Sequence, residues 1–201
     1  YMVDMNNGTN VETTYVGPDS IWGNNLESSD ETVAADAAYG QNMTWDYFKN
    51  VHGRNGIFND GRGLRSRVHY ASNYDNAFWD GSSMTYGDGS FFNPLVSVDV
   101  AGHEMSHGVT QSTAGLIYSG ESGGLNEGTS DIFGTMVEYY ANNASDTPDY
   151  LIGEKLYNTP GSALRYMIKP SQDGVSADCW YNGVGNIDVH YSSGVANHFF
   201  Y

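Results

Sequence analysis

Apolar positions in the second half of the chain recur with a helical period. The first set comprises Val96, Val100, Met105 and Val109. Its spacing predicts a helix of about four turns that ends at Gly115. The second set comprises Ile132, Phe133, Met136, Val137 and Tyr140. It predicts a helix that begins near Asn126 and continues to the Asn142-Asn143 pair.

The first half of the chain combines one helical segment with several strand-like segments. Ser28 and Glu31 form a capping box, which predicts the start of a helix in the alanine-rich stretch that runs to about Lys49. Residues 64–70 have the composition of a strand. Residues 77–79 and 83–86 flank an Asp-Gly pair, an arrangement typical of a β-hairpin.

The remaining segments complete the predicted fold class. Residues 143–190 are predicted to be mostly loop with a short ordered piece near Leu164, and a further helix is predicted from about Ser193 to Tyr201. We therefore predict an α+β fold, with a β-rich N-terminal part over residues 1–95 and a mainly helical part over residues 96–201. Because the chain stops inside a predicted helix, we expect it to be a fragment.

Charge and cysteine content narrow the classes of function. The sequence has 8 Lys and Arg against 24 Asp and Glu, a formal net charge of −16. Such a surface repels phosphate backbones, so no nucleic-acid partner is expected. The acidic residues fit a solvated face that keeps a secreted protein soluble and also fit the binding of hard cations, and both can hold together. No apolar run is long enough to span a membrane, and the single cysteine, Cys179, excludes both an intrachain disulfide and a cysteine-rich zinc module.

The first predicted helix carries the motif His103-Glu104-Met105-Ser106-His107. On a helix, two histidines at this spacing project from one face and can share a cation. Glu104 lies about 100° around the helix, where it can contact a metal-bound water without binding the metal itself. The alternative is that both histidines are ordinary side chains of an amphipathic helix.

A third ligand favours the metal-binding interpretation. Residues 126–131 read Asn-Glu-Gly-Thr-Ser-Asp, which places Glu127 in the first turn of the second predicted helix and Asp131 one turn later. Two histidines and one glutamate leave a fourth position open, which is the catalytic form of a zinc site. Asp131 would then orient one imidazole, and Glu104 would act as the general base.

These motifs, together with three others, resemble those of the thermolysin-like neutral metalloproteases (peptidase family M4, gluzincins). The other motifs are Asn-Ala-Phe-Trp at residues 76–79, Tyr-Gly-Asp-Gly at residues 86–89 and Asp-Val-His-Tyr-Ser-Ser-Gly at residues 188–194. Residues 179–195 are similar to the griselysin-like branch. The resemblance implies a thermolysin-like fold with the zinc helix at the floor of a cleft, further chain at both ends, and one zinc ion. It also implies a hydrolase that cleaves peptide bonds on the N-terminal side of apolar residues.

The resemblance also assigns roles around the reacting bond. It implies that His190 and Tyr118 donate hydrogen bonds to the oxyanion and that Asp188 holds the His190 imidazole in its donating form. Arg165 matches the arginine that reaches the substrate carbonyl. Without the resemblance, Tyr118 and Arg165 would be interpreted as ordinary surface or core residues.

Substrate binding is implied by a strand and a set of apolar positions. Asn76 and Ala77 match the edge strand that pairs with an extended substrate, although the same residues fit an ordinary hairpin. The apolar positions that match the pocket for the residue after the scissile bond are Phe92, Leu95, Val100, Ile152 and Leu164. Each of them fits a core position equally well.

Calcium is the second metal that the resemblance implies. The family ligands match Asp99, Glu138, Asp149 and Glu154. Leu151 stands where a double site has a bridging glutamate, which favours one calcium ion over two.

Partners and alternatives follow from these assignments. We expect a secreted, extracellular, monomeric zinc metalloendopeptidase that acts on protein or peptide substrates, with a propeptide or a protein inhibitor as a further partner. An aminopeptidase would need an acidic anchoring motif such as Gly-x-Met-x-Asn ahead of the zinc helix, and the sequence has none. A catalytically incompetent autolytic or metal-binding fragment stays open as the alternative function.

Overall fold

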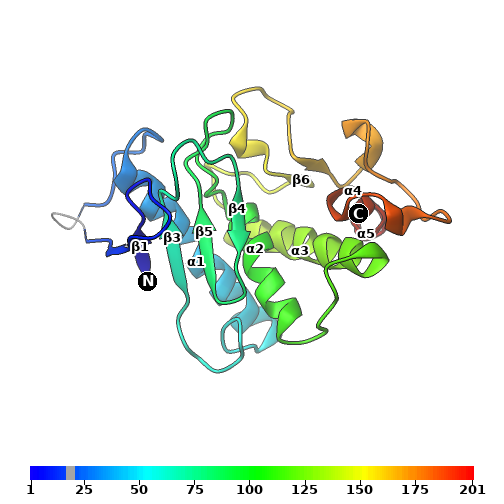
Figure 1. Cartoon of the computed structure of the whole chain (residues 1–201), viewed down its shortest axis with the longest axis horizontal. Helices are drawn as coiled ribbons and strands as arrows, with labels where there is room; N and C mark the ends of the chain where they lie inside the picture. Colours follow the sequence, from blue (N-terminus) through cyan, green and yellow to red (C-terminus); the bar gives the residue numbers. More distant parts are fainter. Residues whose placement is uncertain (17–20) are drawn as a thin grey trace.

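The computed structural model describes residues 1–16 and 21–201. Its N-terminal half contains a mixed five-stranded sheet in the order β2-β1-β3-β5-β4. The strands are β1 (Met2–Asp4), β2 (Thr13–Thr14), β3 (Arg65–Val68), β4 (Ala77–Trp79) and β5 (Ser83–Tyr86). The predicted hairpin is confirmed as β4 paired antiparallel with β5, which leaves β4 at the sheet edge (Figure 1). The parallel pairing of β3 with β1 and β5 joins segments that are distant in the sequence.

Of the three long helices, α1 and α2 pack against this sheet, and α3 packs against both of them (Figure 1). They are α1 (Asp30–His52), α2 (Val98–Gln111) and α3 (Gly120–Ala141). Helix α1 ends at Gly53, whose φ of 66° is a left-handed conformation that glycine adopts without strain. Helices α2 and α3 approach so closely that a Cβ on Gly102 would lie 2.9 Å from the Cα of Gly134. This contact brings the metal-binding motif of α2 against α3.

Short elements follow α3. They are β6 (Leu151–Ile152), η1 (Glu154–Leu156), β7 (Arg165–Tyr166), η2 (Pro170–Asp173), η3 (Val184–Asn186), α4 (Val189–Ser192) and α5 (Gly194–Phe200). Strand β7 supplies the ordered piece expected near Leu164, and α5 supplies the helix expected near Ser193. The predicted α+β class is therefore confirmed. No helix within residues 1–16 and 21–201 is long and apolar enough to cross a membrane.

Two predicted helix boundaries were wrong. Helix α2 ends at Gln111, before the predicted Gly115, and α3 begins at Gly120, before the predicted Asn126. Glycines in the first turns of α3 lower its intrinsic helix propensity and concealed its start. They are needed for packing, because a Cβ on Gly124 would lie 2.3 Å from the Ser192 hydroxyl of α4. Glu127 therefore stands well inside α3 and not in its first turn.

Candidate functional site

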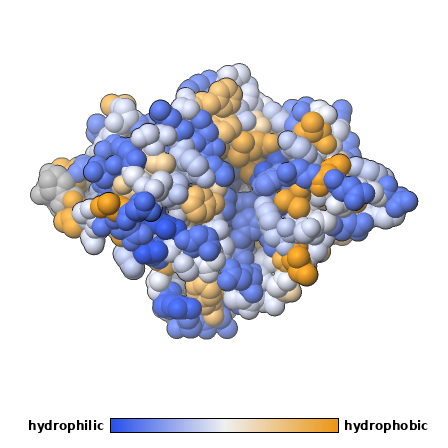
Figure 2. All heavy atoms as spheres, in the orientation of Figure 1, coloured by the Kyte–Doolittle hydropathy of each residue, from blue (hydrophilic) through white to orange (hydrophobic). Residues whose placement is uncertain are grey.

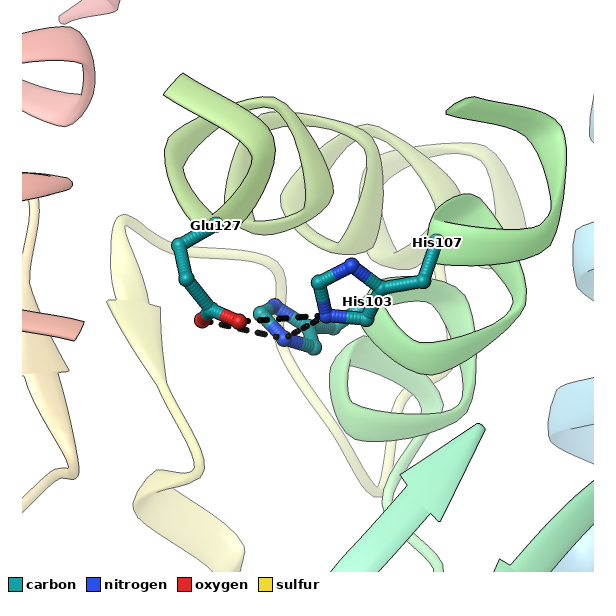
Figure 3. Close-up of side chains that lie close together, drawn as sticks. All are labelled: His103, His107 and Glu127. Carbon is teal, nitrogen blue, oxygen red and sulfur yellow. Dashed lines mark hydrogen bonds and ion pairs between the residues drawn. The ribbon is translucent and has the colours of Figure 1, made fainter. Parts of the chain in front are cut away.

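Helices α2 and α3 bring His103, His107 and Glu127 together (Figure 3). The two Nε2 atoms of the histidines are 3.1 Å apart. His103 Nε2 lies 3.4 Å from Glu127 Oε2, and His107 Nε2 lies 3.2 Å from Glu127 Oε1. His103 and Glu127 are buried, with 5% and 0% of their surfaces exposed. The predicted spacing on one helix face therefore produces a converging set of ligand atoms.

The chemistry of this donor set fits a zinc ion. Two ring nitrogens facing each other at this distance need a proton or a cation between them. Glu127 Oε2 is buried and accepts no hydrogen bond from any described residue. Burial opposes ionisation of Glu127, but the charge of His103, the hydrogen bond from His107 and the charge of Arg165 hold its pKa well below the usual range. Two imidazoles and an ionised carboxylate are the ligands of a catalytic zinc site.

Each histidine is held through its other ring nitrogen. His103 Nδ1 lies 2.7 Å from Asp131 Oδ1, and His107 Nδ1 lies 2.7 Å from Asn126 Oδ1. Both contacts leave Nε2 free to face the metal position. Asp131 was expected in this role. Asn126 was not, although it directly precedes the ligand Glu127 in the sequence.

Glu104 is oriented by the edge strand of the sheet. Its Oε2 accepts a 3.1 Å hydrogen bond from the backbone N–H of Trp79 in β4. Burial raises the pKa of the Glu104 carboxyl, against the opposing charges of His103 and His107. A carboxylate with a raised pKa beside a metal position is suited to accept and return a proton.

The site opens into a cleft of about 590 Å³ between β4 and the helices. Asn76, Ala77, Glu104 and His190 are among the residues that line it. Figure 2 shows the hollow between the two halves of the molecule, bordered by both hydrophilic and hydrophobic residues.

A smaller pocket of about 80 Å³ adjoins the cleft. Arg165 lines this pocket. Four of the five predicted apolar residues also line it, namely Leu95, Val100, Ile152 and Leu164. Phe92 does not line it, because its ring packs against Tyr157 with centroids 5.2 Å apart. The backbone of the 90–92 turn is held by Asp75 and directs Phe92 to this cluster.

Tyr118 and His190 reach the metal ligands from the opposite wall. The Tyr118 hydroxyl donates a hydrogen bond to Glu127 Oε1 and lies 3.3 Å from His190 Nε2. Asp188 Oδ1 is 2.6 Å from His190 Nδ1, and the same oxygen accepts the His190 backbone N–H. These hydrogen bonds lower the pKa of Asp188. Arg165 contacts Asp131 through Nε at 2.7 Å and Nη2 at 2.6 Å.

A second group of ionisable residues lies at the far end of α3. Carboxylate oxygens of Glu138, Asp146 and Glu154 lie within 4.8 Å of one another. Within the described residues, Glu138 Oε1 and both Glu154 oxygens accept no hydrogen bond. Burial and the neighbouring charges, that of Asp99 first, raise the pKa of Glu138 to about 10 and that of Glu154 to about 8. Buried, repelling oxygens of this kind are suited to a hard cation.

The predicted calcium ligands only partly coincide with this group. Asp99 is buried beside it and accepts hydrogen bonds from Ser97 and Gly153. The Asp149 carboxylate instead accepts the Leu151 N–H at 2.7 Å, so it closes its own turn. Asp146 was not predicted, because a bridge between residues 143 and 146 brings it into the group and no short-range motif marks that turn.

Two models of one protein family match nearly the whole chain. The model of the thermolysin metallopeptidase catalytic domain matches residues 1–111, and the model of the thermolysin metallopeptidase alpha-helical domain matches residues 114–201. The chain belongs to the thermolysin metallopeptidase family. Members of this family depend on zinc, in agreement with the donor set above.

Individual relatives support this placement within the thermolysin family. The chain is 60% identical to a transglutaminase-activating metalloprotease of Streptomyces mobaraensis over 98% of its own length and 26% of that protein. It is 44% identical to the thermostable neutral protease NprT of Geobacillus stearothermophilus, over 98% of this chain and 38% of that protein. A precursor of protealysin from Serratia proteamaculans superimposes with a TM-score of 0.79 at 32% identity, over 99% of this chain and 66% of that structure. The chain thus spans well under half the length of the Streptomyces and Geobacillus proteins.

Proposed function

We propose that the protein is a zinc-dependent endopeptidase that hydrolyses peptide bonds on the N-terminal side of apolar residues. The observation that carries this proposal is the convergence of His103, His107 and Glu127 in a cleft that also contains Glu104. Membership of the thermolysin family supports the same reaction.

Glu104 is the proposed general base. His103, His107 and Glu127 would hold the zinc ion, which when bound would polarise the scissile carbonyl and acidify a water molecule. Glu104 takes a proton from the attacking water and passes it to the leaving amine. The Trp79 N–H keeps one carboxylate oxygen in place, and burial raises the pKa of Glu104, which favours its taking up a proton.

Tyr118 and His190 are the proposed donors to the oxyanion. Asp188 Oδ1 accepts from His190 Nδ1 and turns Nε2 toward the cleft, where the imidazole donates to the oxyanion when both of its nitrogens carry a proton. The Tyr118 hydroxyl lies beside Nε2 and also faces the cleft. Donors placed in advance where negative charge develops stabilise the transition state more than the bound substrate.

The edge strand and the small pocket are the proposed substrate contacts. Strand β4 pairs with β5 along one edge, which leaves its other edge for an extended peptide, with Asn76 and Ala77 lining the cleft. The apolar side chains around the small pocket favour a residue such as leucine after the scissile bond.

The test is a cleavage assay on the complete protein with two quenched fluorescent peptides that differ only in having leucine or aspartate after the scissile bond. We expect cleavage of the leucine peptide, loss of activity with a zinc chelator, and recovery with added zinc. Tight zinc binding without cleavage of either peptide would instead favour the catalytically incompetent fragment.

We also propose one calcium ion bound by Glu138, Asp146 and Glu154, with Asp99 beside them. An ion that binds only the folded state stabilises by mass action, by about 2.7 kcal/mol at a free concentration about 100 times its Kd. Removal of calcium should lower the thermal unfolding midpoint and speed autolysis. Glu138→Gln should abolish this response, whereas Asp60→Asn, a matched change at an exposed carboxylate, should keep it; an unchanged midpoint without calcium would contradict the site.

Secretion, a monomeric state, and a propeptide or protein inhibitor as partner stay predictions. Size-exclusion chromatography with light scattering tests the monomeric state, and analysis of culture medium tests secretion.

A further inference from the structure

Asp131 is the most heavily hydrogen-bonded carboxylate around the metal position. It is 0% exposed. Its Oδ1 accepts from His103 Nδ1 at 2.7 Å and from Arg165 Nη2 at 2.6 Å. Its Oδ2 accepts from Arg165 Nε at 2.7 Å and from Asn197 Nδ2 at 2.7 Å. Three of these four bonds involve residues with a proposed role, and the fourth comes from Asn197 on α5.

Close packing of α5 on α3 brings the Asn197 side-chain amide to Asp131. Gly128 stands one turn before Asp131, and a Cβ on it would lie 2.6 Å from the Cβ of Ala196 and 3.1 Å from the carbonyl oxygen of Ser193. The absence of a side chain at Gly128 therefore lets α5 approach α3 closely enough for Asn197 to reach the carboxylate.

Asn197 is itself buried, with 1% of its surface exposed. Its Oδ1 accepts no hydrogen bond from the described residues, so the side chain's one hydrogen bond among them is the one to Asp131. A buried amide with one unsatisfied atom costs stability, and an apolar side chain would avoid that cost. The residue is therefore better explained by what it does to Asp131 than by its contribution to the core.

We propose that Asn197 is a positioning residue for the metal site. By occupying the remaining acceptor site of Oδ2, it prevents the Asp131 carboxylate from rotating toward Arg165. The carboxylate then keeps Oδ1 on His103, which fixes the tautomer and the ring orientation of that ligand. This inference rests on the proposed zinc site.

The first test compares Asn197→Leu and Asn197→Ala with the parent in the complete protein. Leucine removes the donor and keeps the branching at Cγ in a larger side chain, and alanine removes the donor without any possible clash. We expect zinc binding, measured by competition with a chromophoric chelator, to weaken by about 10–100-fold, as is usual when a partner of a metal ligand is lost. The visible spectrum of the cobalt-substituted protein should shift, and kcat should fall while KM changes little.

The matched control is Thr135→Val. Thr135 is buried on α3 one turn after Asp131 and donates its hydroxyl hydrogen bond at 3.1 Å to the sulfur of Met167, away from the carboxylate. This change should lower the thermal midpoint of the metal-free protein without changing zinc affinity or the cobalt spectrum. An equal loss of zinc affinity in the control would reduce Asn197 to a structural role.

The proposal is overturned if both Asn197 variants keep the parent's zinc affinity and cobalt spectrum. If neither variant folds without metal, as judged by circular dichroism, the role is structural and the proposal likewise fails. A parent protein that binds zinc tightly but cleaves no peptide would contradict the proposed function, while the zinc affinities of the variants would still decide the role of Asn197.

Discussion

At the scale of single residues, the site depends on hydrogen bonds that fix which atom of each side chain faces the cleft. Asp131 and Asn126 form hydrogen bonds with the Nδ1 atoms of the two histidine ligands, and Asp188 does so with Nδ1 of His190. As a result three imidazoles present Nε2 toward Glu127, from two different walls of the cleft. The chemistry of each ring is therefore set by a neighbour as much as by the ring itself.

His190 tests whether this second wall takes part in catalysis. His190→Ala should lower kcat by about 10²–10³ with little change in KM, because an oxyanion donor acts mainly in the transition state. Zinc content should not change. The control is His198→Ala, since that exposed histidine contacts the Asp178 carbonyl and does not line the cleft. Steady-state kinetics that find the His190 variant as fast as the parent would contradict this role.

A buried histidine outside the site predicts how stability depends on pH. His69 is 2% exposed, and its Nδ1 lies 3.0 Å from both oxygens of Asp88. Burial lowers the pKa of His69, but the hydrogen bond and charge of Asp88, with further contributions from Asp30 and Asp4, raise it above 6.5 overall. A histidine whose pKa is higher in the folded state than in the unfolded state stabilises the fold. This stabilisation is complete at a pH below the unfolded-state pKa, and it is lost as the pH rises through the folded-state pKa.

The thermal midpoint should therefore fall as the pH rises above 6.5. His69→Asn should flatten this decline, because asparagine removes the titrating group while tolerating the φ of 54° at this position. The measurement is thermal unfolding of parent and variant across the neutral to alkaline range at fixed calcium. Equal slopes for the two proteins would show that His69 does not carry the effect.

At the scale of elements, the contact between α2 and α3 sets the distance between the metal ligands. A Cβ on Gly134 would lie 2.5 Å from the carbonyl oxygen of Asp99 on α2. Gly134→Ala should therefore push the helices apart, lower stability by about 1–3 kcal/mol and weaken zinc binding. Gly63→Ala is the matched control, since no described atom beyond the two neighbours in the chain lies within 4 Å of a Cβ there. Denaturant unfolding and chelator competition on both variants check the prediction, which fails if the two behave alike.

The elements also show what could be predicted from the sequence. The spacing of His103 and His107 and the Asp-Gly turn of the hairpin are local patterns, and both predictions agree with the structure. The start of α3 was not predicted because glycines there lower the helix propensity. They are present because α4 packs too closely to leave room for side chains. The parallel pairing of β1, β3 and β5 and the position of Asp146 depend on contacts between distant segments, which no local pattern encodes.

At the scale of the whole molecule, the cleft lies where the sheet and the helical half meet. The Trp79 N–H of β4 holds Glu104 of α2, while α3 and α4 supply Glu127 and His190. The site is therefore assembled by the packing of both halves. The metal ligands and Glu104 could be assigned from local spacing, whereas the residues of β4 and α4 could be assigned only through the family resemblance. The division into parts at residues 95 and 96 stays a prediction.

The most direct test of the central claim is the rate of peptide hydrolysis by Glu104→Gln, measured together with its zinc content. The amide oxygen of glutamine can still accept the Trp79 N–H, and the three metal ligands are untouched. We predict a full complement of zinc and a fall in kcat of about 10²–10⁴, the range expected for loss of a general base. A zinc-loaded variant that hydrolyses the peptide as fast as the parent would contradict the account.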